Sequence, residues 1–386
     1  MRPLVKSLLL VAVLTGLVVY LGRRFPGMEK GTDFPDFYVA ARMVHAGAGH
    51  ELYSAAAQRE FQIRYAGRVG TYFIHPPFET LLYLPFAQWP MERAYLLWSL
   101  LDVGLLLVTA RVMTLEVLPG RDWQMLAAGA LVFAPVLLNF IQGQDSVLLL
   151  FLLVLAFTAL RREQPLAAGA WLACGLFKFH LVLPIAVILL FGKRWRLLGG
   201  FAAGAVVLGL VSAAISGRGW LAAYARFLGE LAKLPMAGIH PEEMANLRGL
   251  VALLFPASAW ILLTVASSLV VLGLAIRGWN RAGVKLGFAN TVTAAALVSY
   301  HLSPHDLSVL LLPMALLWRH AWAASMPKWR RWIEVTTVIL LFLPPMHLWL
   351  LRWHVYGYMA VLTVILFSAT CVEIDRVPGT EHRARS

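Results

Sequence analysis

The sequence predicts an all-α integral membrane protein that crosses the bilayer about 10–12 times. Of its 386 residues, 60% are hydrophobic and 14% are charged, whereas charged residues make up about a quarter of an average soluble domain. The mean hydropathy is +0.72. The net charge of +13 comes from Lys and Arg gathered in short segments between apolar runs, a pattern typical of cytoplasmic loops. The charge therefore indicates topology, and no nucleic-acid partner is expected.

Twelve apolar segments are candidate membrane spans, because a hydrocarbon core about 30 Å thick takes ~20 residues of helix. They lie near residues 5–21, 93–113, 123–141, 145–160, 165–177, 180–192, 196–215, 250–276, 285–300, 306–318, 332–350 and 355–373. The fifth, sixth and tenth are short, which predicts tilted, broken or partly re-entrant helices. No small-residue cleavage pattern follows the first segment, so we expect an uncleaved helix there and not a signal peptide.

Alternate crossings of these spans gather the basic segments on one side of the membrane. Those segments are Arg111 with Arg121, Arg161 with Arg162, Lys193–Arg196, Arg277 with Arg281 and Lys285, and Arg319–Arg331. The positive-inside rule identifies that side as the cytoplasm. Arg23 and Arg24 oppose this orientation weakly, although long outer loops often escape the rule. We expect a multi-pass protein of the cell inner (plasma) membrane.

The polar segments then fall on the extracytoplasmic side. They are two long loops, 22–92 and 216–249, and the shorter segments 142–145 and 301–306. We expect residues 1–373 to form a single membrane domain and residues 374–386 to form a polar cytoplasmic tail.

The first long loop has an internal pattern of its own. Residues 34–46 and 54–65 are predicted to form helices. The apolar stretch 78–89 is too short to span comfortably and carries Glu79, so we expect it to lie along the membrane surface.

A series of short motifs runs from about residue 30 to about residue 320. They are Asp33–Ala41, Gly47, Leu52-Tyr53, His75-Pro76-Pro77, Gly143-Gln144, Ala168-Gly169 with Gly175 and Lys178, Lys193–Arg196, Asn246–Gly249 and Ser303–Asp306. In this order and spacing they resemble the polyprenol-phosphate-sugar-dependent transferases of glycosyltransferase family 87. The chain departs from the family pattern at His75, at Leu247-Arg248 and at Phe179, where the family often has Tyr, Gln-Ser and Pro.

The resemblance implies a GT-C type fold with a long first extracytoplasmic loop. It also implies transfer of a hexose, such as mannose, from a polyprenyl-phosphate donor to a lipid or glycan acceptor on the outer face. The donor is a substrate that reaches the site from the membrane lipids, and no cofactor is expected. Such a reaction needs a carboxylate to deprotonate the acceptor hydroxyl and cations to stabilise the departing phosphate.

Asp33 is the candidate general base, because it matches the acidic residue of the family and follows the first span after a short linker. Ionisable groups near membrane depth are usually functional. The alternative is that Asp33 caps a helix that begins before Pro35. Asp36 is assigned to sugar or acceptor binding, with capping or solvation as its alternative.

Two cations are candidates for binding the donor phosphate. Lys178 interrupts apolar sequence, so it either snorkels to the interface or holds an anion. Arg248 offers a bidentate guanidinium at the start of a predicted span. Pairing of Arg248 with Glu242 or Glu243 on a solvated loop is an equal alternative.

His301 and His305 have the four-residue spacing of two metal ligands on a helix. Pro304 lies between them and disfavours that helix, so no metal is expected. We assign both histidines to the donor phosphate. Asp306 has a simpler interpretation as the cap of the next helix.

Gln142, Gln144 and Asp145 lie where two predicted spans turn on the outer face. Their amide and carboxylate groups suit the hydroxyls of a sugar, and they suit equally the capping of the helix that follows. We assign Gln144, Asp145 and Asn246 to sugar or acceptor binding.

Two further classes of function stay open. A transporter or lipid flippase would line a path with the same polar residues, and it would show intramembrane charges or inverted repeats. The polar segments lie at helix ends and no repeat is visible, which favours the enzyme. A non-catalytic protein with the same fold is the second alternative.

Overall fold

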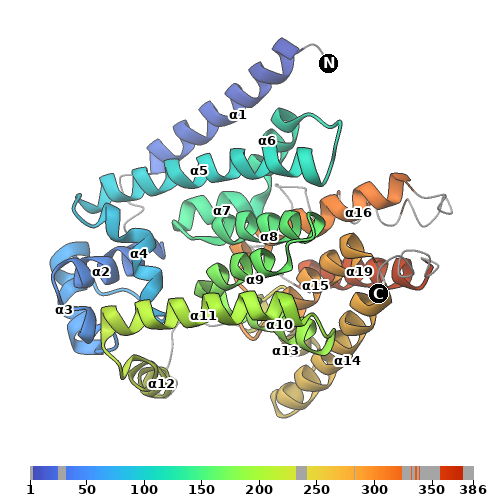
Figure 1. The fold of residues 1–386 in the computed structure, drawn as a ribbon. Helices are drawn as coiled ribbons and strands as arrows, with labels where there is room; N and C mark the ends of the chain where they lie inside the picture. Colours follow the sequence, from blue (N-terminus) through green and yellow to red (C-terminus); the bar gives the residue numbers. More distant parts are fainter. Residues whose placement is uncertain are drawn as a thin grey trace. The chain divides into compact units, whose positions relative to one another are not determined.

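The computed structural model describes residues 3–24, 32–231, 241–281, 283–323 and 357–376, with isolated positions between 324 and 356 (Figure 1). In that part of the chain every regular element is a helix and no strand occurs. The predicted all-α class is confirmed. The predicted span at 332–350 and most of the predicted tail lie outside the described residues.

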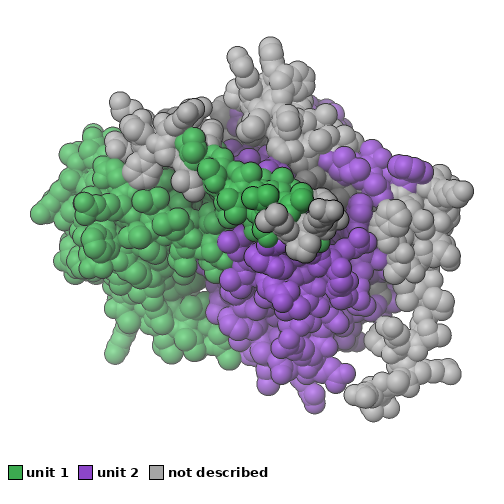
Figure 2. Space-filling view, turned by 90° about the horizontal axis from the view of Figure 1, so that it is seen from above, with its two compact units in different colours: residues 1–105, 139–145, 203–239 green, residues 106–138, 146–202, 240–386 purple. Residues whose placement is uncertain are grey.

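The chain divides into two compact units (Figure 2). Unit 1 comprises Met1–Leu105, Asn139–Asp145 and Ala203–Ile239, and unit 2 comprises Leu106–Leu138, Ser146–Ala202 and His240–Ser386. Three helices are divided between the units: α5 (Met91–Glu116), α7 (Ala134–Gln142) and α11 (Trp195–Ser216). The single domain expected for residues 1–373 stays a prediction.

The remaining helices each belong to one unit. In unit 1 they are α1 (Pro3–Arg24), α2 (Phe34–His45), α3 (Ala55–Ala66), α4 (Thr80–Tyr83), α12 (Trp220–Leu231) and the 3-10 helices η1 (Gly49–Glu51), η2 (Pro77–Glu79) and η3 (Leu84–Phe86). In unit 2 they are α6 (Trp123–Val132), α8 (Ser146–Arg161), α9 (Pro165–Cys174), α10 (Phe179–Phe191), α13 (Leu247–Leu254), α14 (Trp260–Arg281), α15 (Val284–Val298), α16 (Leu311–Ala323), α19 (Gly357–Arg376) and η4 (Gly175–Lys178), η5 (Pro241–Glu243), η6 (Ala257–Ala259) and η7 (Pro304–Leu310).

Four described helical stretches are long and apolar enough to cross a membrane. They are Met91–Glu116, Pro165–Phe191, Trp195–Ser216 and Ala257–Arg281, and the pair α6 and α7, bent by 67°, is a fifth candidate. Only 11% of the most apolar part of Ala257–Arg281 is buried, and Ile261 is 81% exposed. Apolar side chains exposed in this number along a helix are the surface that lipid covers. The chain is an all-α membrane protein.

The segment 165–191 differs from the prediction. The sequence predicted two spans with a turn near residue 178, whereas α9, η4 and α10 follow one another as a single 27-residue candidate span, Pro165–Phe191. The 3-10 turn η4 continues the helical path and does not reverse it. One crossing in place of two changes the alternation of all later spans. The side of the membrane assigned to the later loops stays a prediction.

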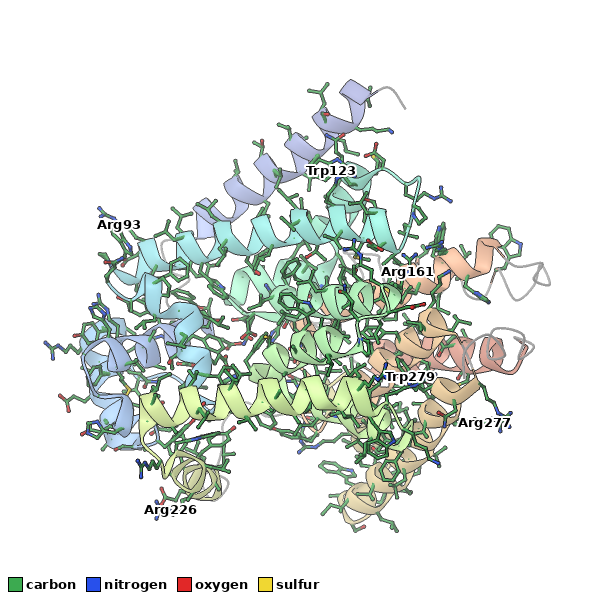
Figure 3. All side chains as sticks on the ribbon, in the orientation of Figure 1. Arg93, Trp123, Arg161, Arg226, Arg277 and Trp279 are labelled. Carbon is green, nitrogen blue, oxygen red and sulfur yellow. The ribbon has the colours of Figure 1, made fainter. Side chains whose placement is uncertain are left out.

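Several predicted basic segments lie together within unit 2. At the end of α5, the carboxylate of Glu116 pairs with Arg161 at 3.1 Å and with Arg162 at 2.7 Å, and Arg319 Nη1 donates to the Val117 carbonyl at 2.9 Å. Figure 3 shows Arg161 near the end of α8. The ends of α5, α8 and α16 therefore meet.

A second basic group lies at the other end of the Pro165–Phe191 stretch. The guanidinium of Arg194 stacks over the Trp279 ring at 5.5 Å and donates to the Trp279 carbonyl at 3.3 Å. The sequence predicted both basic groups on the cytoplasmic side. A single crossing by Pro165–Phe191 would separate them, so the positive-inside rule alone does not orient this part of the chain.

The first loop folds around α2 and α3 as predicted. Pro35 occupies the first turn of α2, where its missing N–H costs nothing, and Gly47 follows the helix at φ +81°. The Ser54 hydroxyl caps α3 by accepting from the Ala57 N–H, and Gly67 ends it in the left-handed region. The predicted surface segment 78–89 breaks into short turns, none of which is long enough to span.

Aromatic side chains form the core of unit 1. Phe37 stacks on Tyr83 with ring centroids 4.8 Å apart, and Tyr83 stacks on Trp98 at 4.2 Å. Phe34 makes an edge contact with Tyr95 at 5.2 Å. Each buried ring of this kind contributes about 1.5–3 kcal/mol by leaving water. The start of α2 is therefore fixed on α4 and the first turns of α5.

Unit 2 packs its helices through small residues. A Cβ atom at Gly169 would lie 1.9 Å from the Leu197 carbonyl, and one at Gly200 would lie 2.0 Å from the Leu166 carbonyl. The backbones of α9 and the start of α11 are thus in direct contact, as in small-residue crossings of membrane helices. Every residue of α15 from Leu286 to Leu297 is buried, so α15 is the central helix of this unit.

Candidate functional site

Asp33 lies at the N-terminus of α2 and is half-buried. Its Oδ2 accepts a hydrogen bond from Gln144 Nε2 at 2.7 Å. Its backbone N–H donates to Gln142 Oε1 at 3.2 Å. Two of the predicted polar segments therefore meet within unit 1, although more than 100 residues separate them in the chain.

The structure separates the two interpretations of Asp33. Its side chain makes no capping hydrogen bond to α2, and its backbone already has helical angles, φ −84° and ψ −17°. A capping aspartate normally has an extended backbone and accepts from the second or third N–H of the helix. The carboxylate of Asp33 is instead directed to Gln144. The capping alternative is wrong for this residue.

Gly143 lets the two glutamines approach α2. Its φ is +64°, and a Cβ atom there would lie 2.7 Å from the Phe34 Cβ. Both the backbone conformation and the space therefore require glycine. The segment is held further by Tyr95, whose hydroxyl donates to the Phe140 carbonyl at 2.6 Å, and by Trp98, whose Nε1 donates to the Gln144 carbonyl at 3.4 Å.

Asp36 is the more buried of the two carboxylates, with 8% of its surface exposed. The Thr71 hydroxyl donates to its Oδ2. Burial raises the pKa of Asp36 to about 7, while the Thr71 hydrogen bond opposes the rise, nearby Asp33 adds to it, and Arg68 and His75 oppose it. Asp36 therefore exchanges a proton near neutral pH, next to the candidate base.

Two glutamines on α3 position Thr71 over Asp36. Gln58 Nε2 donates to the Phe73 carbonyl at 3.1 Å, and its Oε1 accepts from the Phe73 N–H at 2.7 Å. Gln62 Nε2 donates to the Thr71 carbonyl, and its Oε1 accepts from the Gly70 N–H at 3.2 Å. Both glutamines are 2% exposed, so these bonds order the strap 70–73.

The His75-Pro76-Pro77 motif packs against α2. The His75 ring lies 5.1 Å from the Phe37 ring, and its Nδ1 is 3.0 Å from the Oε2 of Glu79. The His75 carbonyl accepts from the Tyr53 hydroxyl at 2.8 Å. The motifs of the first loop therefore assemble around the helix that carries Asp33 and Asp36.

The cations predicted to bind phosphate lie in unit 2. Lys178 Nζ is 3.0 Å from Asp306 Oδ1, and the two side chains are 3% and 2% exposed. Ser146 Oγ also donates to Asp306 Oδ1, at 3.0 Å, and His305 Nε2 lies 3.6 Å from the same atom. The charge of Lys178 is thus balanced by a carboxylate, and its phosphate role stays a prediction.

Asp306 also takes part in capping η7, in which Ser303 is the N-cap and Asp306 is the third residue. Its Oδ2 accepts from the Ser303 N–H at 2.9 Å, and together they form a capping box at the start of η7. Capping and ion pairing use different oxygens of this carboxylate.

Asn246 and Arg248 hold the segment between α15 and η7. Asn246 Nδ2 donates to the Ser299 carbonyl at 2.8 Å, and its Oδ1 caps α13 by accepting from the Gly249 N–H at 2.9 Å. Arg248 Nη1 donates to the Tyr300 carbonyl at 2.7 Å. The alternative pairing of Arg248 with Glu242 or Glu243 stays open.

The two predicted phosphate-binding histidines have different surroundings. His301 is half-buried, and its Nε2 lies 3.3 Å from Ser303 Oγ, whereas His305 is 6% exposed and faces Asp306. A third histidine, His180, bonds through Nδ1 to Ser299 Oγ at 3.0 Å. Among the described residues no group of three or more metal-ligating side chains has metal-binding geometry.

A family comparison decides the identity of this chain. The model of glycosyltransferase family 87 matches residues 73–304, which is more than half of the sequence. The chain belongs to glycosyltransferase family 87. It is a membrane glycosyltransferase, because the family consists of glycosyltransferases and the chain has helices long and apolar enough to cross a membrane. Neither a curated protein nor a solved structure matches the chain.

The family match includes some of the candidate site residues and leaves others out. It includes Gln144, Asp145, Lys178 and the segment Asn246–Arg248, and it ends just after His301, at Pro304. Asp33, Asp36 and His305 lie outside it. The roles of Asp33 and Asp36 therefore rest on their chemistry and geometry in unit 1.

Sequence reasoning missed the residues that position the acids of this glycosyltransferase. Thr71, Gln58 and Gln62 act on Asp36 across a loop, and no local pattern marks such a contact. One signal was present: Gln58 and Gln62 are four residues apart and so share a face of α3. Ser146 was also missed: Asp145 next to it was a candidate, but nothing in the sequence indicated that the Ser146 hydroxyl bonds to Asp306.

Proposed function

We propose that this glycosyltransferase moves a hexose, such as mannose, from a polyprenyl-phosphate donor to a lipid or glycan acceptor. Asp33 acts as the general base. The acceptor hydroxyl gives its proton to the Asp33 carboxylate as its oxygen bonds to the anomeric carbon, and the bond from that carbon to the phosphate oxygen breaks. The polyprenyl phosphate leaves as an anion, and no cofactor takes part.

The observation that carries this proposal is the hydrogen bond from Gln144 Nε2 to Asp33 Oδ2, at 2.7 Å. It orients one oxygen of a half-buried carboxylate that is not used as a helix cap. The amide orients the carboxylate towards the space where an acceptor hydroxyl would bind in the proposed reaction. Family membership favours transfer over transport.

Asp36 has a supporting part in the proposed reaction. Its pKa of about 7 allows it to be protonated near neutral pH. A neutral Asp36 avoids repulsion between the two acids and supplies a donor for a sugar hydroxyl. We assign Gln144 and Asp145 to sugar recognition, and Arg248, His301 and His305 to the donor phosphate.

The test is transfer of radiolabelled mannose from polyprenyl-phosphate-mannose into lipid-extractable or polymeric product. Membranes carry wild type, Asp33→Asn or Glu60→Gln at matched expression. Glu60 is an exposed carboxylate on α3 in the same unit, so its variant controls for loss of one negative charge. We expect Asp33→Asn to lose at least about 100-fold, the usual contribution of a general base. Equal transfer by wild type and Asp33→Asn would remove Asp33 from the mechanism.

We also propose that the site faces the extracytoplasmic side of the inner membrane. The test places a cysteine at Glu60 or, as a control, at Glu163, which is exposed in the loop between α8 and α9 and was predicted to be cytoplasmic. A membrane-impermeant maleimide added to intact cells should label the first variant and should label the second only after permeabilisation. The reverse pattern would place the site in the cytoplasm.

A further inference from the structure

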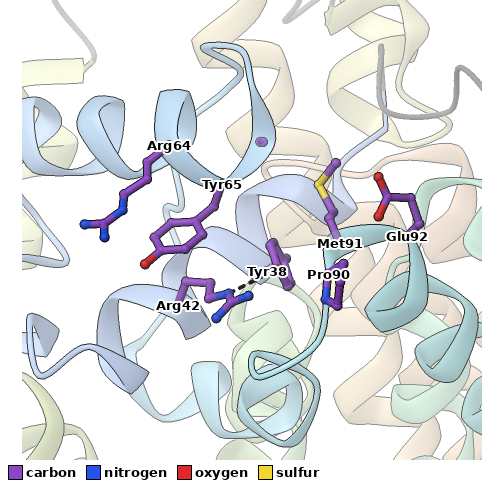
Figure 4. A pocket seen from close by; sticks show the side chains of 8 residues that line it. Tyr38, Arg42, Arg64, Tyr65, Pro90, Met91 and Glu92 are labelled. Atoms are coloured by element: carbon purple, nitrogen blue, oxygen red, sulfur yellow. Dashed lines mark hydrogen bonds between the residues drawn. The ribbon is translucent and has the colours of Figure 1, made fainter.

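A polar groove lies on unit 1, and neither Asp33 nor Asp36 lines it. Its volume is about 410 Å³, and Tyr38 and Arg42 of α2, Arg64 and Tyr65 of α3, and Met91 and Glu92 at the start of α5 line it (Figure 4). None of these residues has a part in the mechanism proposed above.

Two guanidinium groups converge on one ring in this groove. The Arg42 guanidinium carbon lies 4.8 Å from the centre of the Tyr65 ring, and that of Arg64 lies 5.3 Å from the same centre. Figure 4 shows Arg42 and Arg64 on either side of Tyr65. Two like charges that share one aromatic ring gain from an anion between them.

Arg42 is held in place before any ligand arrives. Its Nε donates to the Tyr38 hydroxyl at 2.9 Å, and its Nη2 donates to the Trp89 carbonyl at 3.2 Å. The Tyr38 hydroxyl in turn donates to the same carbonyl at 2.7 Å. These bonds leave Nη1 of Arg42 for a ligand. A side chain that is already ordered loses little entropy on binding.

The charge of the groove is not balanced within the described chain. Glu92 is the one carboxylate that lines it, and neither Arg42 nor Arg64 forms an ion pair with a described residue. Two arginines against one exposed glutamate leave a net positive charge. Arginine on an aromatic face, with a free edge of N–H groups, suits the oxygens of a phosphate or a carboxylate.

The position of the groove limits the source of the anion. At 1.5 Å per residue, Arg42 lies about 14 Å along the helix axis from Asp33. Met91 and Glu92 begin a candidate membrane span, Met91–Glu116, so the groove lies at the level where a span leaves the bilayer. An anionic group there belongs either to a lipid headgroup or to a sugar one or two residues from the reacting hydroxyl.

We propose that this groove is a subsite for a phosphate or other anionic group of the acceptor, with Arg42 and Arg64 as its ligands. The acceptor class is then an anionic glycolipid or glycan. The assignment to the acceptor rests on the proposed function, whereas the binding of an anion does not.

The test measures the reactivity of individual arginines in the full-length protein. Phenylglyoxal modifies the protein in phosphatidylcholine nanodiscs, with inorganic phosphate or with chloride at equal ionic strength, and peptide mass spectrometry follows each arginine. Arg59 is the internal control, since it is exposed on α3 and does not line the groove. We expect phosphate to slow modification of Arg42 and Arg64 several-fold and to leave Arg59 unchanged.

A second arm separates the two sources of the anion. Nanodiscs that contain phosphatidylglycerol replace added phosphate. Protection by inorganic phosphate supports a soluble anionic group, and protection by phosphatidylglycerol alone assigns a lipid headgroup. If Arg42 and Arg64 react in step with Arg59 under all conditions, the proposal is overturned.

Transfer by variants keeps this proposal separate from the proposed function. Arg64→Gln should lower transfer of radiolabelled mannose to endogenous membrane acceptors about tenfold, the effect of one charge-assisted hydrogen bond. Arg59→Gln should not lower it. Protection of Arg42 and Arg64 without any transfer of mannose would support the anion subsite and contradict the proposed function. Transfer without protection would support the proposed function and contradict the subsite.

Discussion

The acids of the two units are held in opposite ways. Asp33 and Asp36 of unit 1 are bonded to an amide and a hydroxyl, whereas Asp306 of unit 2 is bonded to a buried lysine and to Ser146. Burial raises the pKa of Asp36 to about 7, so this carboxyl can gain and lose a proton near neutral pH. A lysine at 3.0 Å fixes Asp306 in the charged state. Asp36 is therefore held as a group that can exchange a proton, whereas Asp306 is held as part of a buried ion pair.

Breaking the ion pair of unit 2 should have the largest effect on stability. Lys178→Met leaves Asp306 buried without its main counter-charge, so we expect a loss of about 3–5 kcal/mol in the free energy of unfolding. Lys178→Met with Asp306→Asn should recover most of that loss, because asparagine still accepts from the Ser303 N–H. Unfolding in detergent measures both. A single variant as stable as wild type would contradict the structural role.

The acids of unit 1 are tested by the glycine that aligns them. Gly143→Ala forces a Cβ against Phe34, where the space is 2.7 Å, and should cost about 1–3 kcal/mol and displace Gln144 from Asp33. Transfer should fall at least about tenfold. Gly120→Ala is the matched control, since Gly120 also has a positive φ, +82°, but has open space around it. Equal loss of transfer in both variants would mean that backbone strain alone matters.

Titration of Asp36 makes the stability of the protein depend on pH. Its pKa of about 7 is above the ordinary 3.8, so the folded protein binds more protons than the unfolded chain between about pH 4 and pH 7. Stability therefore falls as pH rises through that range and stays lower above it. Asp36→Asn removes this dependence and should be about 1–3 kcal/mol more stable than wild type at pH 8. Denaturant unfolding at pH 5 and pH 8 measures the difference, and parallel behaviour of the two proteins would refute it.

The smallest expected effects come from the hydroxyl donors. Ser146→Ala removes one hydrogen bond to Asp306 and should cost about 1–2 kcal/mol with little change in the pH profile of transfer. Thr71→Val should shift the alkaline limb of transfer to higher pH, because loss of the Thr71 hydrogen bond raises the pKa of Asp36 and the proposed role needs Asp36 protonated. Thr71→Ser should keep the limb where it is. A profile unchanged by Thr71→Val would exclude Asp36 from the transfer step.

The local sequence predicted those features that depend on residues close together in the chain. Composition gave the all-α membrane class, and the Pro35 and Ser54 signals placed α2 and α3. The alternation of predicted spans placed Asp33 and Gln144 on the same side of the membrane, but it did not predict the hydrogen bond between them. By contrast, Thr71 reaches Asp36 across 35 residues and Lys178 reaches Asp306 across 128, and nothing in the local sequence of either partner marks the other.

The sequence predicted a break between two spans near residue 178, and the structure has none there. Gly175 and the charge of Lys178 resemble the end of a span, and the segments on either side are short. In the structure the charge is neutralised by Asp306, so the helical path continues through it. A hydropathy pattern does not include a partner that arrives from elsewhere in the chain.

The apolar stretch Ala257–Arg281 has a consequence for the membrane that houses this enzyme. Its 25 residues extend about 37 Å at 1.5 Å per residue, which exceeds a hydrocarbon core about 30 Å thick. Such a helix leans over, or the lipid beside it stretches. Acyl-chain length is thus a physical variable acting on α14, and a thicker bilayer lets this helix stand more upright.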